Sequence, residues 1–425
     1  MGVKGPFIDW LRMMYDKMGY VVRVGSSYSE AFSSDVGVLT GSPNSPNLFN
    51  LAVADFKVVE HPDDVVLHDK IINHILQADD TGMATTVASS MHSKLRQFEM
   101  YAAKTGFAVS VPKCLMAVFG KNPDPGAVFL IHGKPMRKET EFKYMGAWHQ
   151  TPLRGSMYKK NYEAYAEKAK NIAGAVLHAK TFVGKDIPVW DMRQLYIGRV
   201  DPYLMNGAEF IVDTVKKNRE VLEAVQHYFL RRMLSLQSRS SLAVLFTETG
   251  LLPIRYRRIV ILLKNMQYLV QLPHNHYTWK AFREAYNLAH DGKHSLFMET
   301  CFVLETLPIP VTWNVPTFEN ITVEHIQSLI VRVQESMKQD IQSQLMACPR
   351  TADSLRGRME FDKKSEKLVF QALAFRHYLR VPSGIHRIAL IHVVTGNHKL
   401  AVERLRWNER NKPHVPREQR LCRFC

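Results

Sequence analysis

The sequence predicts an α+β fold, an antiparallel sheet with helices, over about the first 150 residues, and a mainly α-helical remainder. Two observations indicate this division. Up to about residue 150, short apolar and β-branched runs alternate with turns rich in Gly, Pro, Ser and Asp. Beyond that point, apolar residues recur every three or four positions over long stretches, with Lys and Arg on the other face.

The expected elements follow from these two periodicities. Gly19 and Gly106 end two helices of the first region, because glycine is favoured just beyond a helix. Its helices are expected at residues 7–18, 48–54 and 87–105, and its strands at 20–24, 71–76, 107–111, 115–119, 128–131 and 142–146. In the second region, helices are expected at 158–180, 215–236, 255–270, 323–345 and 365–378.

Composition indicates a globular chain with an affinity for polyanions. The 425 residues suffice for about three domains, and 46% hydrophobic with 23% charged residues excludes a disordered or fibrous protein. Lys and Arg total 56 against 40 Asp and Glu, a net charge of +16. Such a field attracts nucleic acid first and an anionic membrane surface second. A basic solvated surface with no specific partner is the plainer alternative.

The cysteines and the apolar runs bear on the compartment. Cys114, Cys301, Cys348, Cys422 and Cys425 form an odd, scattered set, which is not a disulfide framework and fits a reducing environment. No run has the length of a signal-peptide core at the N-terminus or of a membrane span elsewhere. We expect an intracellular protein, nuclear or cytoplasmic, with no membrane partner.

An acidic turn follows the apolar run at residues 71–76. Asp79 and Asp80 stand directly before Thr81 and Gly82, so the expected strand ends in two carboxylates. Carboxylates at such a tip can coordinate a hard cation such as Mg²⁺, which in turn holds a phosphate. An isolated Asp-Asp pair is more often a solvated turn, and both readings stay open on these residues alone.

Upstream, residues 37–46 are dense in Gly, Pro and Ser and lead into the apolar helix expected at 48–54. Ser45 can cap that helix, and Pro46 suits its first turn. The helix N-terminus and the glycine amides could approach a sugar-phosphate closely. By spacing alone, a simple capped junction between loop and helix is the favoured interpretation.

Four segments then occur in an informative order. They are Gly37-Val38-Leu39-Thr40-Gly41 with Ser45-Pro46-Asn47-Leu48-Phe49-Asn50, then Ala78-Asp79-Asp80, then Gly106 with Lys113, then Phe142-Lys143-Tyr144-Met145-Gly146. The series resembles the palm of reverse transcriptases from non-LTR (LINE-type) retrotransposons, and fungal elements in particular. The resemblance covers residues 1 to about 150 by motif. The remainder resembles the C-terminal region that such elements encode.

The resemblance implies an RNA-directed DNA polymerase with RNA and DNA (template and primer) and deoxynucleotides as partners. In that family two metal ions, Mg²⁺ or Mn²⁺, promote nucleotidyl transfer. Asp79 matches the metal-binding catalytic residue, and Asp80 its neighbour with a lesser role. The family's nucleotide and template contacts fall on Gly37, Thr40, Gly41, Ser45, Pro46, Phe49 and Lys113. The primer grip falls on Phe142, Lys143, Tyr144, Met145 and Gly146.

The chain departs from the family in ways that predict an inactive polymerase. Gln77 stands where the family has an aromatic residue, and Thr40 where it often has Gln. The family also needs a further carboxylate on an earlier strand, whereas Asp9 and Asp16 fall on the first expected helix. The metal site is therefore expected to be incomplete, and the chain to be truncated at its front end, without fingers.

The helical region is expected to divide into a thumb-like part at 151–290, a C-terminal part at 291–405 and a basic tail at 406–425. The helix at 158–180 presents a basic face suited to a phosphate backbone, formed by Lys159, Lys160, Lys168 and Lys170. In the tail, Cys422 and Cys425 make half of a tetrahedral zinc site of the CCHC type. A zinc cofactor is not expected within this chain, which looks truncated at its back end too.

Three alternatives remain open beside the polymerase reading. The chain could be a non-catalytic nucleic-acid-binding protein that uses its positive charge. It could be a helical protein-interaction module in which residues 1–150 act only as a scaffold. It could also be a reading frame with no selected function.

Overall fold

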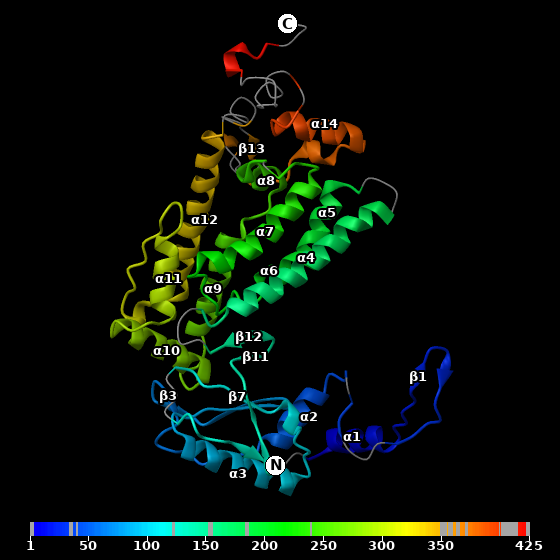
Figure 1. The fold of residues 1–425 in the computed structure, drawn as a ribbon, viewed down its shortest axis with the longest axis vertical. Coiled ribbons are helices and arrows are strands. Elements are labelled where there is room, and N and C mark those ends of the chain that lie inside the picture. The colour runs from blue at the N-terminus through cyan, green and yellow to red at the C-terminus, as the bar shows by residue number, and fades with distance from the viewer. Residues whose placement is uncertain are drawn as a thin grey trace. The chain divides into compact units, whose positions relative to one another are not determined.

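The computed structural model describes residues 4–33, 37–39, 41–120, 124–151, 156–182, 187–238, 240–348, 355, 360–362, 366–369, 373–398, 400 and 415–421. The fold is mixed α and β, which confirms the coarse prediction (Figure 1). The chain divides into two compact units. Unit 1 comprises Met1–Val65, Ile71–Val111 and Gly126–Pro135, and unit 2 comprises Val66–Lys70, Pro112–Pro125 and Met136–Cys425.

In the described part of the first 135 residues, short strands alternate with three α-helices and one 3-10 helix. They are α1 (Pro6–Asp16), β1 (Arg23–Val24), β2 (Ser27–Tyr28), α2 (Ser45–Val53), β3 (Val65–Leu67), β4 (Lys70–Ile72), β5 (His74–Gln77), β6 (Asp80–Met83), α3 (Ala88–Thr105), η1 (Val111–Lys113), β7 (Leu115–Met116), β8 (Leu130–Ile131) and β9 (Lys134–Pro135). The helix expected at 87–105 is confirmed, and Gly106 ends it in the left-handed conformation with φ 75°.

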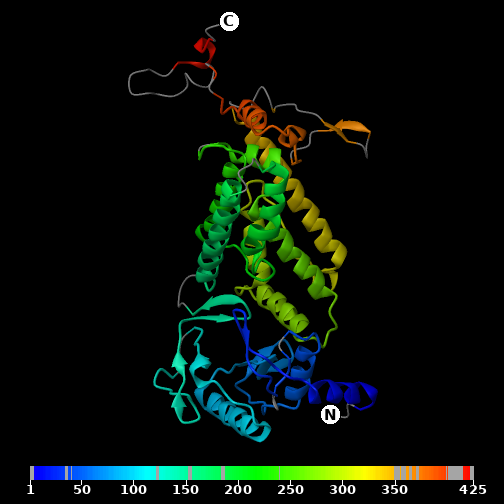
Figure 2. The same cartoon turned by 90° about the vertical axis from the view of Figure 1, so that its right-hand side faces the viewer.

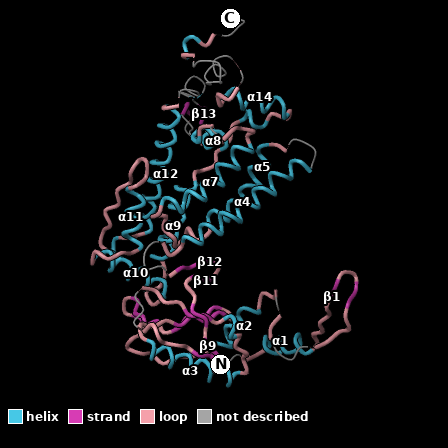
Figure 3. Tube along the Cα trace, in the orientation of Figure 1, coloured by secondary structure: helices cyan, strands magenta, loops and turns pink. Residues whose placement is uncertain are grey.

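Helices dominate the rest of the chain, as Figure 3 shows by the scarcity of strand beyond β12. The elements are β10 (Arg137–Lys138), β11 (Glu141–Tyr144), β12 (Ala147–Gln150), α4 (Lys159–Phe182), α5 (Val189–Leu195), the π-helix η2 (Tyr196–Val200), α6 (Asp201–Met205), α7 (Lys216–Met233), α8 (Leu242–Thr249), α9 (Ile254–Val270), α10 (Tyr277–His290), α11 (Leu296–Glu305), η3 (Phe318–Asn320), α12 (Val323–Met346), β13 (Glu360–Asp362), β14 (Lys367–Val369), η4 (His377–Arg380), α14 (Gly384–Val394) and η5 (Arg417–Gln419).

The strands of the described residues pair in separate two-stranded sheets rather than in one larger sheet. In unit 1, β5 pairs antiparallel with β6, and a two-residue loop joins them. In unit 2, β11 pairs with β12 in the same manner. Two-residue loops need a positive φ at their first position, and Ala78 and Met145 each supply it with φ 51°.

Unit 1 has a small aromatic core around Phe56, which is 4% exposed. Its ring lies 5.8 Å from that of Phe98 and 4.8 Å from that of Tyr101, both on α3, and 5.1 Å from the ring of His74 on β5. Phe56 therefore joins α3, through Phe98 of its predicted apolar face, to His74 on β5.

Among the described residues, the buried apolar side chains of unit 2 form one cluster. Its long helices run side by side (Figure 2). Helix α4 packs along α7, and α9 packs along α12. The core also buries polar pairs: Arg258 Nε lies 2.9 Å from Asp213 Oδ2, and the hydroxyl of Tyr162 donates to the same carboxylate. Pairing offsets the free-energy cost of burying these polar groups. Polar contacts as well as apolar ones therefore join the helices.

Several sequence predictions are wrong in part or in full. The strands expected at 20–24 and 128–131 are shortened to β1 and β8. Residues 107–111 form no strand, because the chain closes on α3 and then turns through η1 at Pro112. The strand expected at 115–119 is shortened to β7, which pairs parallel with β10. The helix expected at 365–378 is replaced by β14 and η4, because the backbone of 374–376 instead bonds to carbonyl oxygens at the end of α8.

Candidate nucleic-acid interface

The acidic pair predicted as catalytic lies at the tip of the β5–β6 hairpin. Gln77 pairs with Asp80 at the last register position, and Ala78 and Asp79 form the loop. Both carboxylates are exposed. The apolar run predicted to end in an acidic turn is therefore confirmed, with an interruption at Asn73 between β4 and β5.

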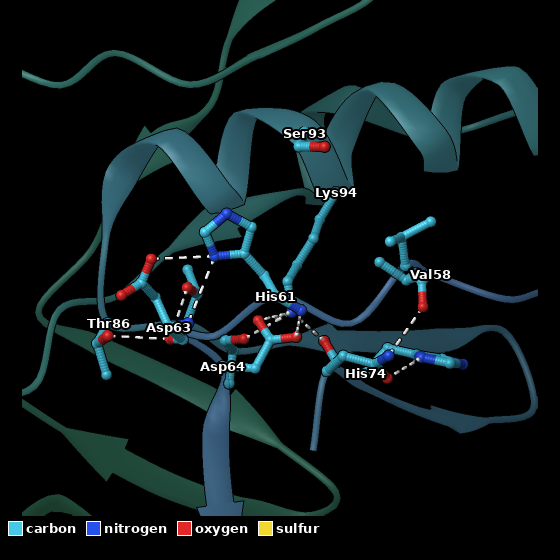
Figure 4. A network of polar contacts seen from close by, with 12 residues as sticks. Val58, His61, Asp63, Asp64, His74, Thr86, Ser93 and Lys94 are labelled. Carbon is cyan, nitrogen blue, oxygen red and sulfur yellow. Dashed lines mark hydrogen bonds and ion pairs between the residues drawn. The ribbon is translucent and has the colours of Figure 1, made fainter. Parts of the chain in front are cut away.

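A buried lysine forms hydrogen bonds at the open end of this hairpin (Figure 4). Lys94, on α3, is 1% exposed, and its Nζ donates to the carbonyl oxygens of Asn73 and Ala84, each at 3.0 Å. These two residues flank β5 and β6 directly. The same ammonium lies 2.5 Å from Oδ1 of Asp64, whose side chain is also 1% exposed. One side chain thus ties both strands of the acidic hairpin to α3.

Polar groups around Asp64 complete this network. Its Oδ2 accepts a hydrogen bond of 2.9 Å from the backbone N–H of His61, and the carbonyl of Asp63 accepts from Thr86. Burial raises the pKa of Asp64, but the hydrogen bond from Lys94 and the charge of Lys94 lower it below its usual value overall. Burial and the nearby ammonium both lower the pKa of His74, which favours its neutral form.

Sequence reasoning missed Lys94, although the sequence carries a signal for it. The residue follows Met91 by three positions and precedes Phe98 by four, so it interrupts the apolar stripe of the helix. A cation on an apolar stripe needs a buried partner, and Asp64 is that partner.

The loop and helix at 37–53 are only partly as predicted. Ser45 does not cap α2; it is the first helical residue, and its hydroxyl donates 2.5 Å to the carbonyl of Leu39. The prediction failed because Asn44 occupies the cap position, without a side-chain bond. Pro46 lies in the first turn, as expected. The ring of Phe49 stacks on Phe107 at 6.0 Å.

The other residues of this segment are placed as follows. Gly37 and Gly41 are exposed in the loop before α2, with φ of 99° and 86°. Thr40 lies outside the described residues. The backbone is accessible at both glycines, because no atom lies within 4 Å of the position that a Cβ atom would occupy.

The residues predicted as primer grip form the β11–β12 hairpin of unit 2. Phe142, Lys143 and Tyr144 lie on β11, and Met145 and Gly146 form the loop. Tyr165 of α4 donates its hydroxyl to the carbonyl of Gly146 at 2.7 Å, which ties the loop to the helix. Lys143 and the loop residues are exposed, whereas Phe142 and Tyr144 are half-buried.

This hairpin borders an open groove of about 460 Å³. The groove is lined by Leu115, Arg137, Glu139, Thr140, Glu141, Phe142, Lys143, Trp148 and Lys160. Lys160 lies over the ring of Trp148 at 4.3 Å and bonds to Glu141, whose pKa that hydrogen bond lowers. Grooves that bind single-stranded nucleic acid combine positive charge with aromatic rings, and this groove has both. The sequence indicated Phe142, Lys143 and Lys160 but missed Trp148 and Arg137.

The predicted site residues divide between the two units. Asp79, Asp80 and the 37–49 segment belong to unit 1, whereas Lys113 and the 142–146 hairpin belong to unit 2. Lys113 is exposed at the end of η1 and is not among the residues that line the groove.

The predicted metal sites need more donor groups than the described residues bring together. Asp79 and Asp80 offer two exposed carboxylates, and in the described part of the chain no group of three or more His, Cys, Asp or Glu is arranged to hold an ion. Two adjacent carboxylates do not supply the ligands of a pair of Mg²⁺ ions, so they do not fit the complete centre. Cys422 and Cys425 lie outside the described residues.

Within the described residues, no helix is both long enough and apolar enough to cross a membrane. A search of protein-family models and a search of curated proteins each found no match to this chain.

Proposed function

We propose that the protein is of the reverse-transcriptase type found in non-LTR retrotransposons, with a palm-like region at residues 1–150 and a helical thumb-like region after it. The observation that carries the proposal is the hairpin with Asp79 and Asp80 exposed at its tip. The order of motifs around this hairpin agrees with the family. The buried anchor Lys94 adds support, because it holds both strands beneath the carboxylates in a defined place.

Within this proposal, the chain's own residues bind and orient nucleic acid rather than complete the chemistry. Lys143 and Arg137 can meet phosphates, and Phe142 and Trp148 can meet sugar or base faces. Asp79 would contribute one ligand to a metal ion that polarises the reacting phosphate. The residues described do not supply the remaining ligands, so no polymerisation step is assigned to them.

Primer extension tests the polymerase part of the proposal. Purified protein is incubated with a primed RNA template, deoxynucleotides and Mg²⁺ or Mn²⁺, beside Asp79→Ala. We expect no extension above the level of this variant, in line with the sequence prediction of an inactive polymerase. Extension by the unaltered protein that Asp79→Ala abolishes would overturn the prediction of inactivity and would strengthen the family assignment.

A second candidate, nucleic-acid binding without catalysis, is favoured by the groove beside β11. Binding of a labelled template–primer is expected to weaken steeply between about 50 and 200 mM salt, because phosphate contacts release counterions. Lys143→Gln should weaken binding and reduce the salt slope by about one. Lys293→Gln is the matched control, since Lys293 is exposed and lies 3.4 Å from Asp291. Absence of binding at low salt would contradict this candidate.

A further inference from the structure

A second cluster of cations and aromatic rings lies in unit 2 and shares no residue with the groove. Its centre is Trp190, on α5, which remains 36% exposed. The guanidinium carbon of Arg380 lies 4.9 Å from the centre of the Trp190 ring, and that of Arg193 lies 5.4 Å from it. Phe375 meets Trp190 edge-on at 5.0 Å and lies 5.4 Å from Arg380. We call these four residues the Trp190 cluster.

The positive charge of the Trp190 cluster is not neutralised by the described residues. Neither Arg193 nor Arg380 has a carboxylate within ion-pair distance among them. Arg193 uses its Nε to donate 3.0 Å to the carbonyl of Thr249, which fixes the side chain without cancelling its charge. Arg283 of α10 provides a contrast: it lies 4.3 Å over Phe318 but bonds to Glu319 at 2.9 Å.

The chain builds this cluster by docking residues 373–380 on the end of α8. The backbone N–H of Arg376 donates to the carbonyl of Glu248 at 3.1 Å, and Phe375 forms a β-bridge with Thr249. Gly250 permits the approach, since a Cβ there would lie 2.9 Å from the backbone nitrogen of Phe375.

A buried carboxylate anchors the same segment from within. Glu248 is fully buried, lies 3.6 Å from the guanidinium of Arg376 and accepts 2.7 Å from the hydroxyl of Tyr378. Phe375 and Arg380 lie on either side of these two anchored residues. Their positions beside Trp190 are therefore set before any ligand arrives, which lowers the entropic cost of binding.

We propose that the Trp190 cluster is a binding site for single-stranded RNA or DNA, separate from the groove beside β11. A base would stack on the exposed part of Trp190, and the two guanidinium groups would meet the neighbouring phosphates. Duplex nucleic acid fits less well, because its bases are already stacked on one another. The inference takes the nucleic-acid partner from the proposed function and adds a second contact, with its own residues and its own strand preference.

The test uses the full chain and fluorescence anisotropy with a labelled oligonucleotide of about 20 nucleotides, single-stranded or as a duplex. Trp190→Ala and Arg380→Gln are each expected to weaken single-strand binding about ten-fold and duplex binding much less. Trp190→Phe should retain most of the affinity, because a phenyl ring still stacks. Arg283→Gln is the matched control and should leave both affinities unchanged. Arg380 is exposed, so its substitution does not open the core.

The outcomes separate this inference from the proposed function. Loss of binding in the Trp190 and Arg380 variants but not in Lys143→Gln supports the cluster and counts against the groove. The reverse pattern overturns the cluster and leaves the proposed function in place. A protein that prefers an acidic peptide, such as polyglutamate, to the oligonucleotide also overturns the inference. No single-strand binding at about 50 mM salt overturns it together with the nucleic-acid part of the proposed function.

Discussion

Unit 1 and unit 2 bury their side chains in different ways. In unit 2, a single apolar cluster of described residues runs through α4, α7, α9 and α12, and its member Phe229 is 0% exposed. In unit 1, α1 leaves Phe7, Trp10 and Met13 about half exposed, and the Asp79–Asp80 hairpin is held by the polar group of Lys94 and Asp64. We infer that the stability of unit 2 depends chiefly on apolar packing, whereas the position of the acidic hairpin depends on one buried ion pair.

The largest expected effect tests the packing of unit 2. Phe229→Ala removes a ring from the middle of α7 and should destabilise unit 2 by about 3–5 kcal/mol, through lost burial and a cavity. Hydrogen exchange followed by mass spectrometry should show the loss of protection in peptides of unit 2. Tyr228→Ala, at the 44% exposed neighbouring position, is the control and should cost much less. Equal effects of the two variants would argue against a packed core at α7.

A comparable effect is expected in unit 1 from a change of charge rather than of volume. Lys94→Met keeps the length of the side chain but leaves Asp64 buried and unpaired, which should cost about 3–5 kcal/mol. Exchange should accelerate in β5 and β6, the strands that Lys94 ties to α3. Lys104→Met, exposed on the same helix, should change exchange little. Unaltered protection of the hairpin in Lys94→Met would show that the ion pair does not hold it.

A smaller effect follows from acidification. Because the pKa of Asp64 is lowered in the folded chain, protonation of this carboxyl favours the unfolded state. Its contribution to stability should be complete above about pH 5 and should be lost as the pH falls through the ordinary value of 3.8 toward the lowered one. The urea concentration at the unfolding midpoint of unit 1 should therefore fall as the pH is lowered through this range. In Asp64→Asn this part of the pH dependence should disappear, and its persistence would assign the acid sensitivity to other groups.

The smallest expected effects on stability come from two substitutions, one of alanine by glycine and one of glycine by alanine. Ala78→Gly in the hairpin loop relieves a φ of 51°, and Gly174→Ala places a methyl group in the interior of α4 where no atom lies within 4 Å. Each should stabilise its own unit by about 0.5–1 kcal/mol in thermal or urea unfolding. Gly106→Ala is the control, because its φ of 75° makes a side chain unfavourable, and it should destabilise unit 1. Destabilisation by Ala78→Gly would show that the loop conformation differs.

Much of the local structure could be predicted from the sequence. The amphipathic period of 87–105 and the glycine after it predicted α3, and the apolar run before Asp79 predicted the acidic hairpin. These elements depend on contacts between residues that are close in the chain, and such contacts can be predicted from residue type and spacing. The same reasoning failed for residues 365–378, because an apolar helical period there is overridden by the docking of Phe375 and Arg376 on α8.

The sequence by itself determined the coarse fold class, a mixture of α and β, through the helical period of its apolar residues and through its turn residues, and it fixed the net charge of +16. Only the tertiary structure decided which charges are buried and which are exposed. Glu248 looks like an ordinary surface residue in the sequence, and Lys94 is marked only by its place on an apolar stripe, yet each is buried against groups at least ten residues away. Burial and pairing depend on which distant segments meet, and neither composition nor spacing specifies that.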